Sequence, residues 1–114
     1  MWTPLAGVCG ALAVGAGAVG AHALPKDLPD TFKDIYKTGS NYHLIHSTAL
    51  MGSALMLKGR KRNIVCGLFA TGIILFSGSC YIVALTGVRK PYSYPAPIGG
   101  FALIGAWVAA GLIP

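Results

Sequence analysis

Two histidines, His43 and His46, stand three residues apart in the stretch NYHLIHSTAL, which opens an otherwise apolar segment at residues 41–57. Imidazole rings in such a setting can bind a metal or haem, transfer protons, or form hydrogen bonds with their surroundings. Residues three apart share one face of a helix, so both rings would point toward the same neighbour. Which chemistry applies depends on the element that carries them and on where it lies.

The composition indicates a membrane protein. Of the 114 residues, 54% are hydrophobic and 11% are charged, and the mean hydropathy is +0.65. Soluble domains carry about 25% charged residues. Every charged residue falls within three short blocks, residues 26–37, residues 58–62 and the pair Arg89–Lys90. The length allows one integral-membrane domain, residues 1–114. The net charge of +6 then favours contact with the anionic headgroups of a lipid bilayer, and not with nucleic acid.

The uncharged stretches between these blocks predict four membrane spans. Leu5–Leu24 is long enough to cross about 30 Å of hydrocarbon as a helix. The second span is short, and apolar residues at three- and four-residue steps predict an amphipathic helix that leads into it from Pro29–Asp30. Since an open sheet cannot survive in lipid, we expect an all-α fold, a four-helix transmembrane bundle with an amphipathic extension before helix 2. The predicted spans are residues 5–24, 42–57, 63–85 and 98–113.

The first span carries two rows of small residues at four-residue spacing. Close packing over small residues, and not the hydrophobic effect, brings helices together in lipid. The rows therefore predict that the first helix is central and touches neighbours on two sides. Packing within the chain is the favoured interpretation, and a homo-oligomer or a protein partner in the membrane is the alternative. The two rows are Gly7, Ala11 and Gly15, and Ala13, Gly17 and Ala21.

Connectivity gathers the polar residues of the spans at one membrane face. His22 ends the first span, His43 and His46 begin the second, and Tyr81 approaches the end of the third. Ionisable groups inside a membrane are candidates for a functional site, although structural hydrogen bonding between helices is the favoured interpretation here. The candidate ligand-binding residues are His22, Tyr42, His43, His46 and Tyr81.

Three ligands fit this layer to different degrees. Haem needs axial histidines on facing helices, which His22 with His43 or His46 would supply, but at a shallow depth. Zinc needs a fuller shell of ligands than the sequence offers, with Cys80 the one further candidate. A quinone or a lipid headgroup needs only a few donors beside an apolar groove. The three cysteines show no C-x-x-C spacing and are expected to be free thiols. We therefore expect no metal site and no cofactor.

The sequence contains no complete catalytic constellation. No Asp or Glu lies within a span, and there is no phosphate-binding loop, serine elbow or acidic metal cluster. This favours a non-enzymatic protein, an accessory or scaffold subunit of a membrane complex. The alternative is the binding of a quinone, lipid or haem at the histidine-rich layer.

Four motifs carry a resemblance to a known family: GAVGAH at 17–22, NYHLIHSTAL at 41–50, FSGSCYIVAL at 76–85 and YPAPIGG at 94–100. With these motifs in order along the whole chain, the sequence resembles transmembrane protein 256 and its bacterial relatives, domain of unknown function 423. The resemblance implies a multi-pass helical protein of the bacterial inner (plasma) membrane or, in eukaryotes, of the mitochondrial inner membrane. The small size and the lack of catalytic residues then suggest a respiratory-chain complex as the mitochondrial partner. The resemblance implies no activity.

Overall fold

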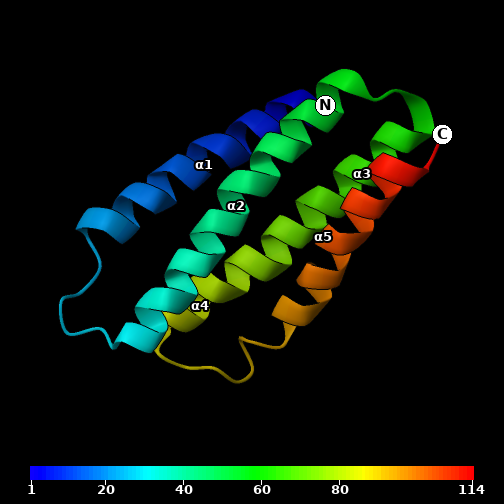
Figure 1. Ribbon diagram of the computed structural model, residues 1–114. Coiled ribbons are helices and arrows are strands. Elements are labelled where there is room, and N and C mark those ends of the chain that lie inside the picture. The colour runs from blue at the N-terminus through cyan, green and yellow to red at the C-terminus, as the bar shows by residue number, and fades with distance from the viewer.

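The computed structural model describes residues 1–114 and consists of four helical rods without strands (Figure 1). The rods are α1 (Trp2–His22), α2 (Asp30–Met56), a continuous third rod and α5 (Pro95–Leu112). The third rod joins α3 (Gly59–Gly72), a π-helical turn η1 (Ile73–Ser77) and α4 (Gly78–Thr86). Both termini lie at the same end of the molecule (Figure 1).

Three of the rods are long and apolar enough to cross a membrane. They are Trp2–His22, Gly59–Thr86 and Pro95–Leu112, and they coincide with the first, third and fourth predicted spans. The second predicted span, residues 42–57, lies within α2. This helix also carries four charged residues near its start, which lower its mean hydropathy. The predicted amphipathic stretch and the predicted second span thus lie in one continuous helix.

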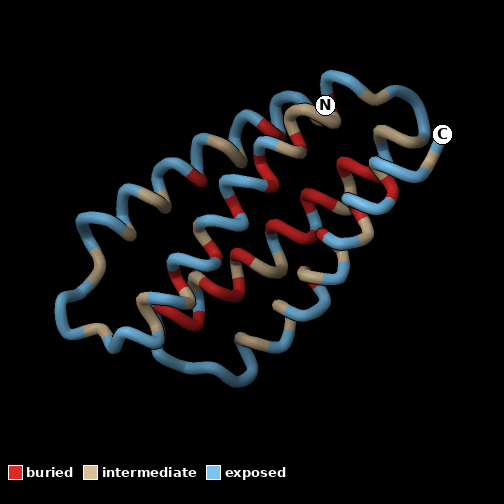
Figure 2. Tube along the Cα trace, in the orientation of Figure 1, coloured by how far each residue is buried: buried red, intermediate tan, exposed pale blue.

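Two rods form the interior of the molecule, and two lie outside them. Buried residues concentrate on α2 and on the third rod, whereas much of α1 and α5 is exposed (Figure 2). The largest buried side chains are Phe69, Leu50 and Val65. Because α1 packs along α2, with few contacts elsewhere, it is a peripheral helix. The prediction that the first helix is central is therefore wrong.

Only part of the small-residue surface of α1 is used for packing. Ala6 and Ala13 are each 2% exposed and face α2, and Gly17 is half-buried with the Ser40 hydroxyl 3.7 Å from a Cβ placed on it. Ala21, from the same predicted row, is exposed. The other row, Gly7, Ala11 and Gly15, is exposed throughout.

Glycine allows α2 and the third rod to approach closely. A Cβ on Gly39 would lie 2.5 Å from the Cβ of Cys80, closer than atoms of this kind can come. At the same level, the Ser77 hydroxyl donates a hydrogen bond of 2.8 Å to the Gly39 carbonyl. Since a missing side chain is what permits this contact, the Gly39–Ser77 crossing fixes the distance between the rods.

Candidate functional site

Both ring nitrogens of His46 are engaged within the protein. The indole N–H of Trp107 on α5 donates to Nε2 over 3.0 Å, and Nδ1 lies 2.7 Å from the Tyr42 carbonyl oxygen one turn earlier. An indole nitrogen can only donate and a carbonyl can only accept. His46 is therefore neutral with its proton on Nδ1, and it joins α2 to α5.

Aromatic rings surround His46 and leave little room for a ligand. Phe69 of α3 and Trp107 lie with their ring centroids 5.9 Å from the imidazole, and these two rings meet edge to face at 5.3 Å. Tyr42 stacks beside His46 at 5.6 Å and contacts Phe76 of η1 at 4.7 Å. His46 itself is 6% exposed. A metal or haem could reach Nε2 only after the Trp107 hydrogen bond had broken.

His43 belongs to a second cluster, which reaches α4 and α1. Its Nδ1 lies 2.8 Å from the Tyr81 hydroxyl on α4. Tyr81 packs against Tyr36, with ring centroids 5.1 Å apart, and the Tyr36 hydroxyl donates a 2.6 Å hydrogen bond to the Ala16 carbonyl on α1. The cluster thus connects α1, α2 and α4 through side chains that are buried or half-buried.

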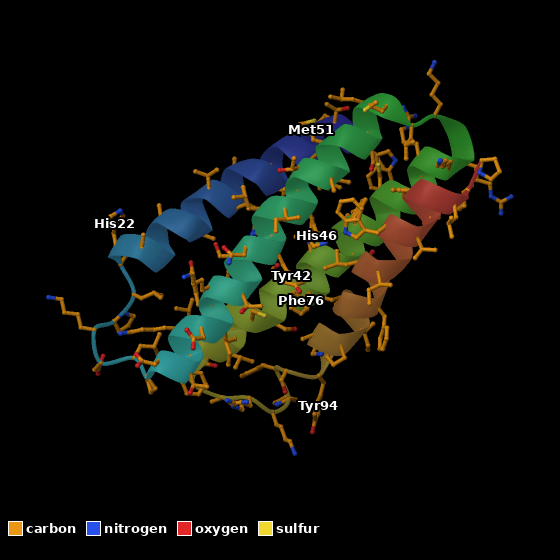
Figure 3. All side chains as sticks on the ribbon, in the orientation of Figure 1. His22, Tyr42, His46, Met51, Phe76 and Tyr94 are labelled. Carbon is orange, nitrogen blue, oxygen red and sulfur yellow. The ribbon has the colours of Figure 1, made fainter.

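The third histidine lies apart from these clusters. His22 is exposed at the C-terminal end of α1, far from the labelled His46 (Figure 3). The structure brings Tyr42 to His46 and Tyr81 to His43, but it does not bring His22 to either. The expectation that His22 lies in one polar layer with His43 and His46 is wrong.

Chemically, the two clusters are sets of hydrogen bonds and ring contacts between helices. No group of three or more His, Cys, Asp or Glu side chains is placed to hold a metal ion. Cys66 and Cys80 are buried, Cys9 is half-buried, and all three are free thiols. Sequence reasoning overlooked Trp107 as the partner of His46. The signal was present, because an indole N–H in an apolar span requires an acceptor.

The fold and the spans define the class: this is an integral, multi-pass, α-helical membrane protein. The chain belongs to the DUF423 family, a protein family of unknown function whose model matches residues 16–100. The matched region contains both histidine clusters except for Trp107. No solved structure matches the chain.

Bacterial relatives are similar along most of their length. The chain is 39% identical to the UPF0382 membrane protein YwdK of Bacillus subtilis over 101 residues, 85% of this chain and 81% of that protein. It is 32% identical to the UPF0382 inner membrane protein YgdD of Escherichia coli K12 over 108 residues, 90% of this chain and 79% of the relative. These names agree with an integral-membrane location.

Proposed function

We propose that this protein is a non-enzymatic accessory or scaffold subunit of a membrane complex. The chain acts as one domain, residues 1–114, in which α2 crosses the membrane as the fourth member of a helix bundle and begins in an amphipathic extension at the interface. The polar clusters around His43 and His46 serve the internal packing of this bundle. They do not act as a reaction centre or a ligand site.

Internal hydrogen bonding supports the packing role. The indole N–H of Trp107 and both nitrogens of His46 are paired within the chain, as are the hydroxyls of Tyr36 and Ser77. In lipid an unpaired polar group costs several kcal/mol. Groups already matched within the protein have little to gain from a ligand, so the same residues that seemed suited to binding stabilise the arrangement of helices.

The exposed row on α1 is the observation that carries the proposal. Gly7, Ala11 and Gly15 form an exposed strip along α1. Nothing lies within 4 Å of a Cβ placed on Gly15, and only the end of Met51 comes within this range of Gly7. A partner helix could approach such a strip closely. The strip thus offers a docking face for a membrane partner, or for a second copy of the chain.

The membrane that holds the protein determines which complex it can join. In a bacterium the partner would lie in the inner membrane, where YgdD is named. In a eukaryotic cell the mitochondrial inner membrane and a respiratory-chain complex would be the corresponding setting.

Co-purification from native membranes in mild detergent tests the proposal. The wild-type chain should elute in an assembly larger than a monomer, together with a stable partner. Gly15→Leu should reduce this association strongly, because a bulky side chain keeps a partner helix from approaching the strip.

Gly111→Leu on α5 is the matched control, since Gly111 is exposed and also has nothing within 4 Å of its Cβ position. It should leave the assembly intact. A solitary wild-type monomer would contradict the proposal, and so would an equal loss of association in the two variants.

A further inference from the structure

A cavity opens between α1 and α2 at the end of the molecule where the two helices are joined. Its volume is about 670 Å³, within the range of roughly 300–1,000 Å³ that ligand pockets occupy. Neither His43 nor His46 lines it, although Tyr36 of the His43 cluster forms part of its wall. The walls come from the last turns of α1, the connecting loop and the first half of α2.

The cavity is lined mainly by polar and basic side chains. Lys33 and Lys37 lie one turn apart on α2, Lys26 comes from the loop, and His22 comes from the end of α1. Asp34 is the one acidic residue in the lining. Even with His22 neutral, three lysines against one carboxylate give the lining a local positive charge that favours an anion. Asp27 and Asp30 lie outside the lining and bring the segment 26–37 as a whole to neutrality.

Close packing of α1 against α2 forms part of the cavity wall. A Cβ on Gly20 would lie 2.8 Å from Cε1 of Tyr36, and the Tyr36 hydroxyl bonds to the Ala16 carbonyl. These contacts hold α1 and α2 together at one level. Gly20 and Tyr36 themselves line the cavity, and Gly17, Ser40 and Asn41 continue its wall along the two helices.

The position of the cavity indicates the source of the anion. His22 is the last residue of a membrane-spanning helix, so the cavity lies at the boundary between hydrocarbon and water, where phospholipid phosphates lie. Basic residues at this level attract anionic lipids. We propose that the cavity binds the phosphate group of an anionic phospholipid, with Lys33 and Lys37 as its principal contacts and Lys26 and His22 at its rim.

Lipid competition in nanodiscs tests the assignment. The full-length protein is reconstituted in phosphatidylcholine, and the association of spin-labelled phosphatidylglycerol is compared with that of spin-labelled phosphatidylcholine. The wild type should prefer the anionic lipid. The pair of substitutions Lys33→Gln and Lys37→Gln should reduce this preference by roughly thirtyfold, from the attraction of about two lysines near the surface.

The pair Lys58→Gln and Lys61→Gln is the matched control, because it removes the same charge from the opposite loop, outside the cavity. It should reduce the preference clearly less than the cavity pair does, because it removes general surface attraction but no contact in the cavity. An equal reduction in both pairs, or no reduction in the cavity pair, would overturn the proposal.

A third variant keeps the test valid if the lysine pair fails to fold. Ala21→Trp fills the cavity from an exposed wall position without a change in charge, and it should reduce the preference about as strongly as the lysine pair. Retention of the preference in this variant would contradict a site in the cavity. Displacement of the labelled lipid by excess inorganic phosphate would contradict the assignment to a lipid, since the free ion would then suffice.

Discussion

The two sides of α2 differ in how completely they are filled. Toward α3, η1, α4 and α5, the helix meets buried aromatic rings and hydrogen-bonded polar groups, and Gly39 touches Cys80. Toward α1, the contact is close only along one line of small residues. It ends in an open cavity, and the far face of α1 is uncovered. On the first side, the hydrogen bonds of His43 and His46 are made within the chain. The second side has exposed surfaces that a partner or a lipid can occupy.

Polar side chains therefore have two different roles in this membrane protein. Buried polar groups that pair with one another specify how the helices pack. Unpaired basic groups at the edge of the membrane are free to bind. The sequence alone does not distinguish them, because His22, His43 and His46 are residues of one type at similar predicted depths. The residues that surround each histidine in the folded protein distinguish the two roles.

The largest effect is expected at the helix crossing on the filled side. Gly39→Leu should destabilise the protein by at least about 1–3 kcal/mol, since any Cβ there collides with Cys80 and the rods must separate. Thermal unfolding in detergent would measure this. Gly52→Ala in the same helix has nothing within 4 Å and should be neutral or slightly stabilising. Similar melting temperatures for the two variants would refute the close approach.

The next effect is expected at the link between α2 and α5. Trp107→Phe should cost about 1–3 kcal/mol, because it leaves Nε2 of His46 buried without a donor. Trp2→Phe is the control, since its indole bonds Asn63 at an exposed position, and it should cost less. Equal unfolding free energies for the two variants would show that the His46–Trp107 bond adds no stability.

A smaller effect is expected at the second cluster. Tyr81→Phe removes the hydroxyl that pairs with His43 but keeps the ring against Tyr36. The cost should be about 0.5–1.5 kcal/mol, because Tyr81 is only half-buried. Tyr94→Phe, at an exposed tyrosine, should leave the unfolding curve unchanged. A visible absorption band that disappears from the purified protein with Tyr81→Phe would instead indicate a bound cofactor.

No loss of stability is expected on the open side. Gly15→Leu should leave the melting temperature of the isolated protein unchanged or slightly higher, because the position is exposed and leucine favours helix more than glycine. The same substitution should still weaken assembly in native membranes. A marked drop in the melting temperature would mean that the row packs within the chain.

Much of the fold follows from hydropathy and charge. The predicted spans 5–24, 63–85 and 98–113 correspond to the helices Trp2–His22, Gly59–Thr86 and Pro95–Leu112. They could be predicted because the length of an apolar stretch determines where a chain can cross lipid. The π-helical turn Ile73–Ser77 was not predictable, because its residues have no local signature that separates them from an α-helix.

The faces of the helices were harder to predict than their limits. On α1 almost every residue is small or apolar, so either row could pack inward, and the choice depended on a partner in α2, Tyr36 against Gly20. The sequence placed His22 in register with Gly7, Ala11 and Gly15. Because that row is exposed, His22 is exposed as well. The spacing predicts that His22 shares a helix face with this row, but it does not predict whether that face is buried or exposed.

Site-specific crosslinking in native membranes tests most directly whether α1 offers a docking face. In a background without the native cysteines, Ala11→Cys places a thiol on the exposed row, and Ala13→Cys places one on the buried face toward α2. With a bifunctional thiol reagent, Ala11→Cys should give an adduct of higher mass and Ala13→Cys should give none. No adduct from Ala11→Cys, or equal adducts from both positions, would contradict the proposed role.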